Sequence, residues 1–276
     1  MNQKTLNELA EAGYITDVTL VAACNEDPSL LEIINFDDFV TQVVSPTDTE
    51  EDSDIEIVKT AEELLNEAIK EGGQITLDHS LNLTMPLIID NEVEIDLNGK
   101  TLMSGVFAEN GGEYSEGNSD AHVFRTVEGA DLTIIGTGKV MAQEATYCMA
   151  VWANGGKVTI KGGTYSNASH GDLIYASYGG KVEIYGGIFK PAEKKSYDEG
   201  TQDHFPALNV KDGDRAISSI TVFGGRFYGF NPGNCMAEGK ETNFVAEGFE
   251  SVEVESGVFE VRKSEESPIE IESATE

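Results

Sequence analysis

Residues 150–167 read AVWANGGKVTIKGGTYSN, and residues 174–191 repeat the pattern as IYASYGGKVEIYGGIFKP. Both contain the unit G-G-K-V-x-I-x-G-G-x-(Tyr/Phe), with Val158 and Val182 lying 24 residues apart. Val158 and Ile160 alternate with polar residues, which is the period of a β-strand with one buried face. The paired glycines that follow supply the backbone conformations of a sharp turn. A repeat of this length, built from short strands and glycine turns, is typical of a solenoid.

The unit recurs less perfectly on both sides of this stretch, so that five copies can be aligned. When the copies are stacked, each buries its apolar face only against its neighbours. An antiparallel sandwich of similar strands is the alternative, but a sandwich gives no reason for one motif to stay in register over five copies. The predicted apolar columns are Leu132, Val158, Val182, Ile220 and Val252; Ile134, Ile160, Ile184, Val222 and Val254; and Val140, Tyr165, Phe189, Phe227 and Phe259.

The composition limits the partners. There are 18 Lys and Arg against 50 Asp and Glu, a formal net charge of −32. Nucleic acid and anionic membrane surfaces are therefore disfavoured, because binding them depends on basic residues. No stretch is long and apolar enough for membrane insertion. With 39% hydrophobic residues and 29 glycines, the composition fits the thin core of a solenoid.

The cysteines and histidines show no metal-ligand spacing, so we expect neither a metal nor another cofactor. The three cysteines are widely separated, which argues against a disulfide framework and for folding in a reducing compartment. The first residues lack the charged and apolar regions of a signal peptide. We therefore expect the protein to be made and folded in cytoplasm. The residues considered are Cys24, Cys148, Cys235, His79, His122, His170 and His204.

The N-terminal part differs from the repeats. Residues 1–45 contain one glycine and no copy of the unit, and we interpret them as a mainly helical attachment segment. Residues 46–56 carry six acids and no base, a composition that favours an extended linker. The Thr60–Glu63 pattern is a capping box, which predicts a helix over 60–71 that covers the open end of the first coil. The repeats continue to residue 262, and 263–276 are interpreted as an acidic tail.

The opening of the repeat region resembles a known superfamily. EELLNEAIKEGGQITL at 62–77, PLII at 86–89 and VEIDLNGKTL at 93–102 look like the start of pectate-lyase-like right-handed parallel β-helices. The resemblance covers 57–261 and implies an all-β, single-stranded parallel β-helix. It implies much less about function, because the superfamily includes polysaccharide lyases, glycoside hydrolases, adhesins and bacteriophage fibres or tailspikes.

Insertions at 104–121, 166–172, 190–206 and 229–243 should lie on one side of the coils, since three of them follow the aromatic residue of the third column. Loops on a rigid scaffold often carry function, so this side is the predicted binding face. The residues that we single out there for a glycan or a protein partner are Trp152, His170, Asp172, Tyr178, Tyr197, Asp203, His204, Asn231 and Asn234.

No catalytic site is predicted. The outward column of the strands contains only two acids, Glu183 and Glu253, which are too far apart for paired carboxylate chemistry. The His170–Gly171 pair occurs in polygalacturonase-type motifs, but the paired aspartates that accompany it there are missing. The other members of this outward column are Thr133, Thr159 and Thr221.

These features resemble bacteriophage virion fibres, and the sequence predicts a non-enzymatic head fibre or capsid decoration protein. Residues 1–45 would bind capsid or other virion proteins, and the loops would bind a host surface glycan. The resemblance also implies a homo-oligomer, with a trimer favoured. The alternatives are a tailspike-type polysaccharide depolymerase, with its site between protomers, and a bacterial surface adhesin.

Overall fold

The computed structural model describes residues 59–108, 119–145, 147–169, 171–193 and 206–264. The chain divides into two compact units, 1–60 and 61–276, and the description below concerns the second. The predicted attachment segment, the linker and the last twelve residues of the acidic tail lie outside the described residues.

The second unit is all-β apart from one helix, and its strands form three sheets. The first sheet has the order β1 (Gly73–Thr76), β4 (Glu92–Asp96), β8 (Asp131–Ile135), β11 (Lys157–Ile160), β14 (Lys181–Ile184) and β17 (Ser219–Val222). The second has β2 (Leu81–Asn82), β5 (Thr101–Met103), β9 (Lys139–Ala142), β12 (Thr164–Asn167), β15 (Ile188–Lys190), β18 (Gly225–Tyr228), β20 (Val258–Lys263) and β19 (Phe249–Glu255). The third has β3 (Leu87–Ile89), β7 (Ser119–Thr126), β10 (Tyr147–Asn154), β13 (Ile174–Ser177) and β16 (Leu208–Val210), with β6 (Phe107–Ala108) paired to β7.

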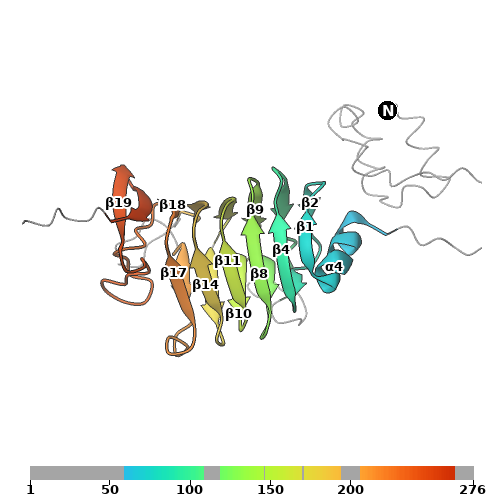
Figure 1. Ribbon diagram of the computed structural model, residues 1–276, viewed down its shortest axis with the longest axis horizontal. Coiled ribbons are helices and arrows are strands. Elements are labelled where there is room, and N and C mark those ends of the chain that lie inside the picture. The colour runs from blue at the N-terminus through green and yellow to red at the C-terminus, as the bar shows by residue number, and fades with distance from the viewer. Residues whose placement is uncertain (1–58, 109–118, 146, 170, 194–205, 265–276) are drawn as a thin grey trace, which may run out of the picture. The chain divides into compact units, whose positions relative to one another are not determined.

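The chain visits the three sheets in rotation, and we call one such passage a coil. Thus β8, β9 and β10 belong to three different sheets, and β11, β12 and β13 follow them in the same order. Apart from β6, β19 and β20, the strands pair in parallel with strands one coil away, and strands of the first sheet lie side by side in Figure 1. The predicted all-β class with parallel pairing is confirmed.

Two of the predicted columns are confirmed over four of their five members, and the third over all five. Val158 is paired with Leu132 on one side and Val182 on the other, and the neighbouring isoleucines follow the same register. In the second sheet the buried rings of Tyr165, Phe189 and Phe227 are stacked at centroid distances of 5.2 and 4.6 Å. The columns also extend one way further than predicted, through Val93, Ile95 and Leu102 of the preceding coil.

The fifth member was wrongly predicted in the first two columns. Val252 and Val254 lie in β19, which pairs antiparallel with β20 instead of joining the first sheet. Phe259 lies beside Phe227, but the two strands run in opposite directions. The reason is at Ser256, which replaces the first glycine of the turn. In an earlier copy this glycine is Gly162, where a Cβ atom would lie 2.4 Å from a backbone oxygen of the preceding coil. The side chain of Ser256 disfavours the same close approach, and the chain forms a hairpin there.

The helix predicted over 60–71 is present as α4 (Ala61–Glu71). It buries Leu65 and Ile69 against the core and contacts β1 and β3, the first strands of two sheets. The Glu62 carboxylate accepts hydrogen bonds from the Thr84 N–H and hydroxyl at 2.9 and 3.1 Å. The helix therefore covers the first coil, where Figure 1 shows it beside β1, and the Glu62 contacts fix it to the loop before β3.

We expect the aromatic stack to be a main source of stability. Phe189→Ala should reduce the free energy of unfolding by about 3–5 kcal/mol, because it removes a buried ring and leaves a cavity between two others. Ile217→Ala is the control, since Ile217 is 59% exposed. Urea denaturation followed by circular dichroism measures both variants. An equal loss of stability in the two would contradict a central role for the stack.

Candidate binding surface

A ladder of outward side chains crosses the third sheet. Arg125, Trp152, Tyr175 and Asn209 occupy the same position in four successive strands, from β7 to β16. We call these four residues the outer ladder. No shared motif places the four together, although Trp152 and Tyr175 each precede an alanine just before a turn. That shared spacing was the available signal.

Trp152 is held in place on several sides. The Arg125 guanidinium lies 4.5 Å from the ring centroid, a cation–π contact. The indole N–H donates to the Ser177 hydroxyl at 2.8 Å. The buried ring of His122 meets the indole edge-on, with centroids 5.3 Å apart. Because Arg125 lies over the indole and Ser177 takes its N–H, Trp152 acts mainly as a rigid wall.

Next to the ladder, a pocket of about 440 Å³ opens beside the turns that follow three strands of the third sheet. Tyr178 forms an exposed wall, at 60% exposure, and has a positive φ of 53°. Its N–H donates to the Asp214 carboxylate at 2.6 Å, and the Lys211 ammonium lies 3.6 Å from the ring centroid. The ring is thus held in place before any ligand arrives. The pocket is lined by Arg125, Val127, Glu128, Trp152, Asn154, Gly155 and Tyr178.

The electrostatics of the ladder change toward its C-terminal end. Burial raises the pKa of Tyr175 to about 12, and the negative charges of Asp172, Asp214 and Asp212 act in the same direction, together with Tyr178. Tyr175 is therefore a neutral phenol at physiological pH and can donate a hydrogen bond. The ladder combines a cation at one end with a neutral hydroxyl and carboxylates at the other.

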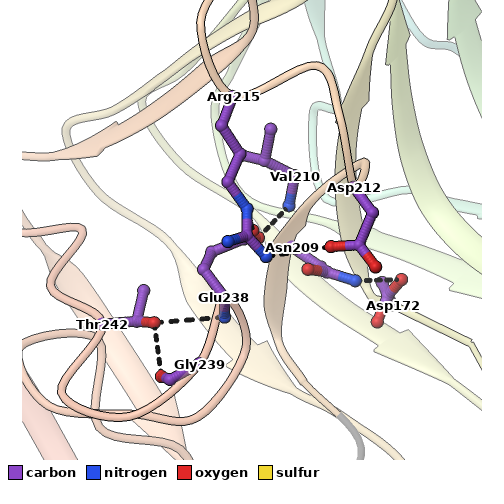
Figure 2. Close-up of polar contacts among 8 residues, drawn as sticks. All are labelled: Asp172, Asn209, Val210, Asp212, Arg215, Glu238, Gly239 and Thr242. Carbon is purple, nitrogen blue, oxygen red and sulfur yellow. Dashed lines mark hydrogen bonds and ion pairs between the residues drawn. The ribbon is translucent and has the colours of Figure 1, made fainter.

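Figure 2 shows the polar contacts at this acidic end. Asn209 donates from its amide nitrogen to the Asp172 carboxylate at 2.8 Å. The Glu238 carboxylate accepts from the Val210 N–H at 2.5 Å and pairs with Arg215, which also contacts Asp212 at 2.9 Å. Glu238 thus bonds the backbone of β16, the last strand of its sheet. It closes an edge that would otherwise remain open to pairing.

The structure brings together only some of the predicted site residues. Trp152 and Tyr178 share the pocket, and Asp172 lies at the acidic end of the ladder. Asn231 instead shapes its own turn, since its side chain accepts from the Gly233 N–H at 2.9 Å, and Asn234 donates to the Asn231 carbonyl at 3.2 Å. His170, Tyr197, Asp203 and His204 lie outside the described residues, as does much of the loops predicted at 104–121 and 190–206.

The outward acids of the strands are arranged differently from the prediction. Glu183 occupies the predicted column with Thr159 and Thr133, and the column continues to Glu94. Glu253 does not belong to it, because it lies in the antiparallel β19 and accepts from the Gly257 N–H at 2.8 Å. Glu94 and Glu183 are separated by three strand spacings, or about 14 Å. That separation exceeds the range of paired carboxylate catalysis.

Across the part of the chain that the structure describes, no group of three or more His, Cys, Asp and Glu side chains could hold a metal ion. In the same residues, no helix has the length and apolar character needed to cross a membrane. Comparison with family models, with curated proteins and with solved structures found no match.

His122 gives the fold a sensitivity to acid. Burial lowers its pKa to about 3, and the Arg125 charge acts in the same direction, whereas an exposed histidine titrates near 6.5. As the pH falls below 6.5, His122 becomes protonated in the unfolded chain but stays neutral in the folded chain. Stability should therefore decrease, by about 2–3 kcal/mol at pH 4.5 from this residue alone.

The test compares urea unfolding of the wild-type protein and His122→Phe between pH 7 and pH 4.5. Phenylalanine keeps a ring beside Trp152 without a titrating group, so the variant should lose less stability over this range. The two proteins differ only at residue 122, so a difference in their acid sensitivity comes from His122. Identical losses in the two proteins would show that His122 does not set the acid sensitivity.

Proposed function

We propose that the coils form a right-handed parallel β-helix and that this protein binds carbohydrate without degrading it. The rotation of the chain through three parallel sheets supports the β-helix, as does the resemblance of residues 57–261 to pectate-lyase-like folds. Right-handedness follows from the strong preference of parallel crossover connections.

The pocket beside Tyr178 is the observation that carries the binding proposal. It joins two aromatic walls to a guanidinium, a carboxylate and an amide, from Arg125, Glu128 and Asn154. A sugar ring presents an apolar C–H face for aromatic packing and a rim of hydroxyls for planar polar groups. Prior fixation of Trp152 and Tyr178 reduces the entropy lost on binding.

Binding without cleavage is supported by the positions of the acids. In the described residues, the outward column of the first sheet separates its two carboxylates by two threonines. The acids at the end of the outer ladder are engaged, Asp172 with Asn209 and Asp214 with the Tyr178 N–H. These contacts favour a structural role for both aspartates.

The order of segments along the chain supports a role in a bacteriophage particle. A compositionally distinct segment at 1–45, an acidic linker at 46–56 and the β-helix are together similar to bacteriophage fibres. We propose that residues 1–45 attach the protein to capsid or other virion proteins after synthesis in the host cytoplasm. The β-helix would then present its pocket to a glycan on the host surface, as part of a homo-oligomer, with a trimer favoured.

Binding to a panel of purified bacterial surface polysaccharides tests the pocket. Tyr178→Ala should weaken binding to any recognised glycan by about tenfold, because it removes the exposed ring wall. Tyr147→Ala is the matched control, since Tyr147 is 43% exposed and does not line the pocket. Unchanged binding by the Tyr178 variant would locate the site elsewhere. Release of reducing ends from the polysaccharide would replace the proposal with a depolymerase.

Removal of residues 1–56 tests the attachment segment. We expect the shortened protein to keep its β-sheet circular dichroism and its thermal transition, because the described core lies C-terminal to residue 60. It should no longer be recovered with purified virus particles. Incorporation at the level of the full chain would exclude the attachment role.

A further inference from the structure

The outer face of the first sheet contains a second and larger hollow, a groove of about 590 Å³. It crosses five strands, from β1 to β14, and so runs from coil to coil. Its floor consists of residues that pair with one another across adjacent strands, and threonines lie between longer polar side chains. The floor residues are Gln74, Glu94, Thr133, Thr159 and Glu183.

The groove has an excess of negative charge. Four acids and two lysines line it, which gives a local charge of −4 + 2 = −2. The Lys157 ammonium is shared between Asp131 and Glu183, at 4.0 and 3.6 Å. Glu92 stands directly opposite Asp131 in the neighbouring strand, an arrangement in which like charges repel.

At the β4 end of the groove, the carboxylates of Glu92 and Glu94 have no cationic partner among the described residues. Glu92 has no ion pair with any described residue, and Glu94 accepts only the amide of Gln74, at 3.1 Å. A positively charged group bound here would relieve the repulsion and form charge-assisted hydrogen bonds. The net charge of −32 on the whole chain also favours the approach of a cation.

Thr159 indicates that the ligand carries hydroxyls as well. Its side chain lines the groove although the residue is only 7% exposed. Among the residues that the structure describes, none forms a hydrogen bond with the Thr159 hydroxyl. Because the side chain faces the groove, a group bound there can form that hydrogen bond.

Tyr185 provides an aromatic wall at the far end of the groove. Its ring is stacked on Phe223 with centroids 4.7 Å apart and is 49% exposed. Its hydroxyl lies 3.5 Å from the Glu183 carboxylate. Backing by Phe223 holds the ring in position, so that the apolar face of a sugar can pack on it at a low entropic cost.

We propose that this groove binds an oligosaccharide of amino sugars. Protonated amines lie beside Glu92 and Glu94, a sugar hydroxyl pairs with Thr159, and a ring packs on Tyr185. The β4 and β11 strands are two spacings apart, about 10 Å, which matches the length of a disaccharide. The site is separate from the pocket beside Tyr178, and the inference does not rest on binding there.

Calorimetric titration of the full chain tests the ligand class at pH 5.5, where the amines of glucosamine oligomers are protonated. The probes are the glucosamine tetrasaccharide, the N-acetylglucosamine tetrasaccharide and spermine. We expect the first to bind and the acetylated form, which lacks the charge, to bind at least about tenfold more weakly. Equal binding of the two sugars, or no binding of either, would overturn the proposal.

Variants distinguish binding in the groove from a non-specific attraction of cations to the negatively charged chain. Glu94→Gln should weaken binding of the glucosamine tetrasaccharide by about tenfold and Thr159→Val by roughly fivefold, since valine keeps the shape and removes only the hydroxyl. Glu241→Gln makes the same charge change at a side chain that is 76% exposed and outside the groove, and it should have no effect. Thermal unfolding confirms that each variant is folded.

Spermine distinguishes a saccharide site from a site for charge alone. We expect spermine to bind more weakly than the tetrasaccharide, and Tyr185→Ala to weaken the tetrasaccharide by about tenfold. If spermine binds as tightly and Tyr185→Ala has no effect, the groove is not a sugar site. If Glu241→Gln weakens binding as much as Glu94→Gln does, the attraction comes from the charge of the whole chain, and the proposal fails.

Discussion

Close contact between backbones at the corners of successive coils controls how this protein stacks. A Cβ atom at Gly180 would lie 2.0 Å from the Ala153 carbonyl oxygen, and one at Gly224 would lie 2.4 Å from that of Tyr185. Any other residue at these corners would push neighbouring coils apart and stretch the parallel hydrogen bonds on both sides. Ser256 shows the consequence, because the last copy of the repeat leaves the stack and forms a hairpin. Repeated glycines therefore permit the close stacking of the later coils.

A stack of this kind has two ends where strand edges are open to other chains. At the N-terminal end, α4 contacts the first strands of two sheets. At the C-terminal end, the antiparallel β19 and β20 complete one sheet, and the Glu238 carboxylate bonds the last strand of another. Both closing elements use acidic side chains, Glu62 and Glu238, as acceptors of backbone N–H groups. Part of the large negative charge is thus used to hold the ends of the stack.

Most of the stack could be predicted from the sequence, because apolar columns repeat at nearly constant spacing. The last copy was misassigned for a physical reason: Val252, Val254 and Phe259 keep the spacing while the corner loses its first glycine. The third sheet was harder to predict, since its outward residues change type from one strand to the next. Arg125 and Asn209 share no pattern with Trp152, and only the register of the strands brings them together. The pocket and the groove each combine residues from at least three coils, which a linear motif does not reveal.

The two outward faces differ in how completely their side chains satisfy one another. On the third sheet, Arg125 lies over Trp152, which donates to Ser177, and Asn209 pairs with Asp172. Such contacts fix the ladder, and two of its members, Arg125 and Trp152, form walls of the pocket. On the first sheet, the Thr159 hydroxyl and the Glu92 carboxylate form no hydrogen bond or ion pair with another described residue, and both line the groove. Their position on a rigid sheet therefore suits the recognition of a ligand.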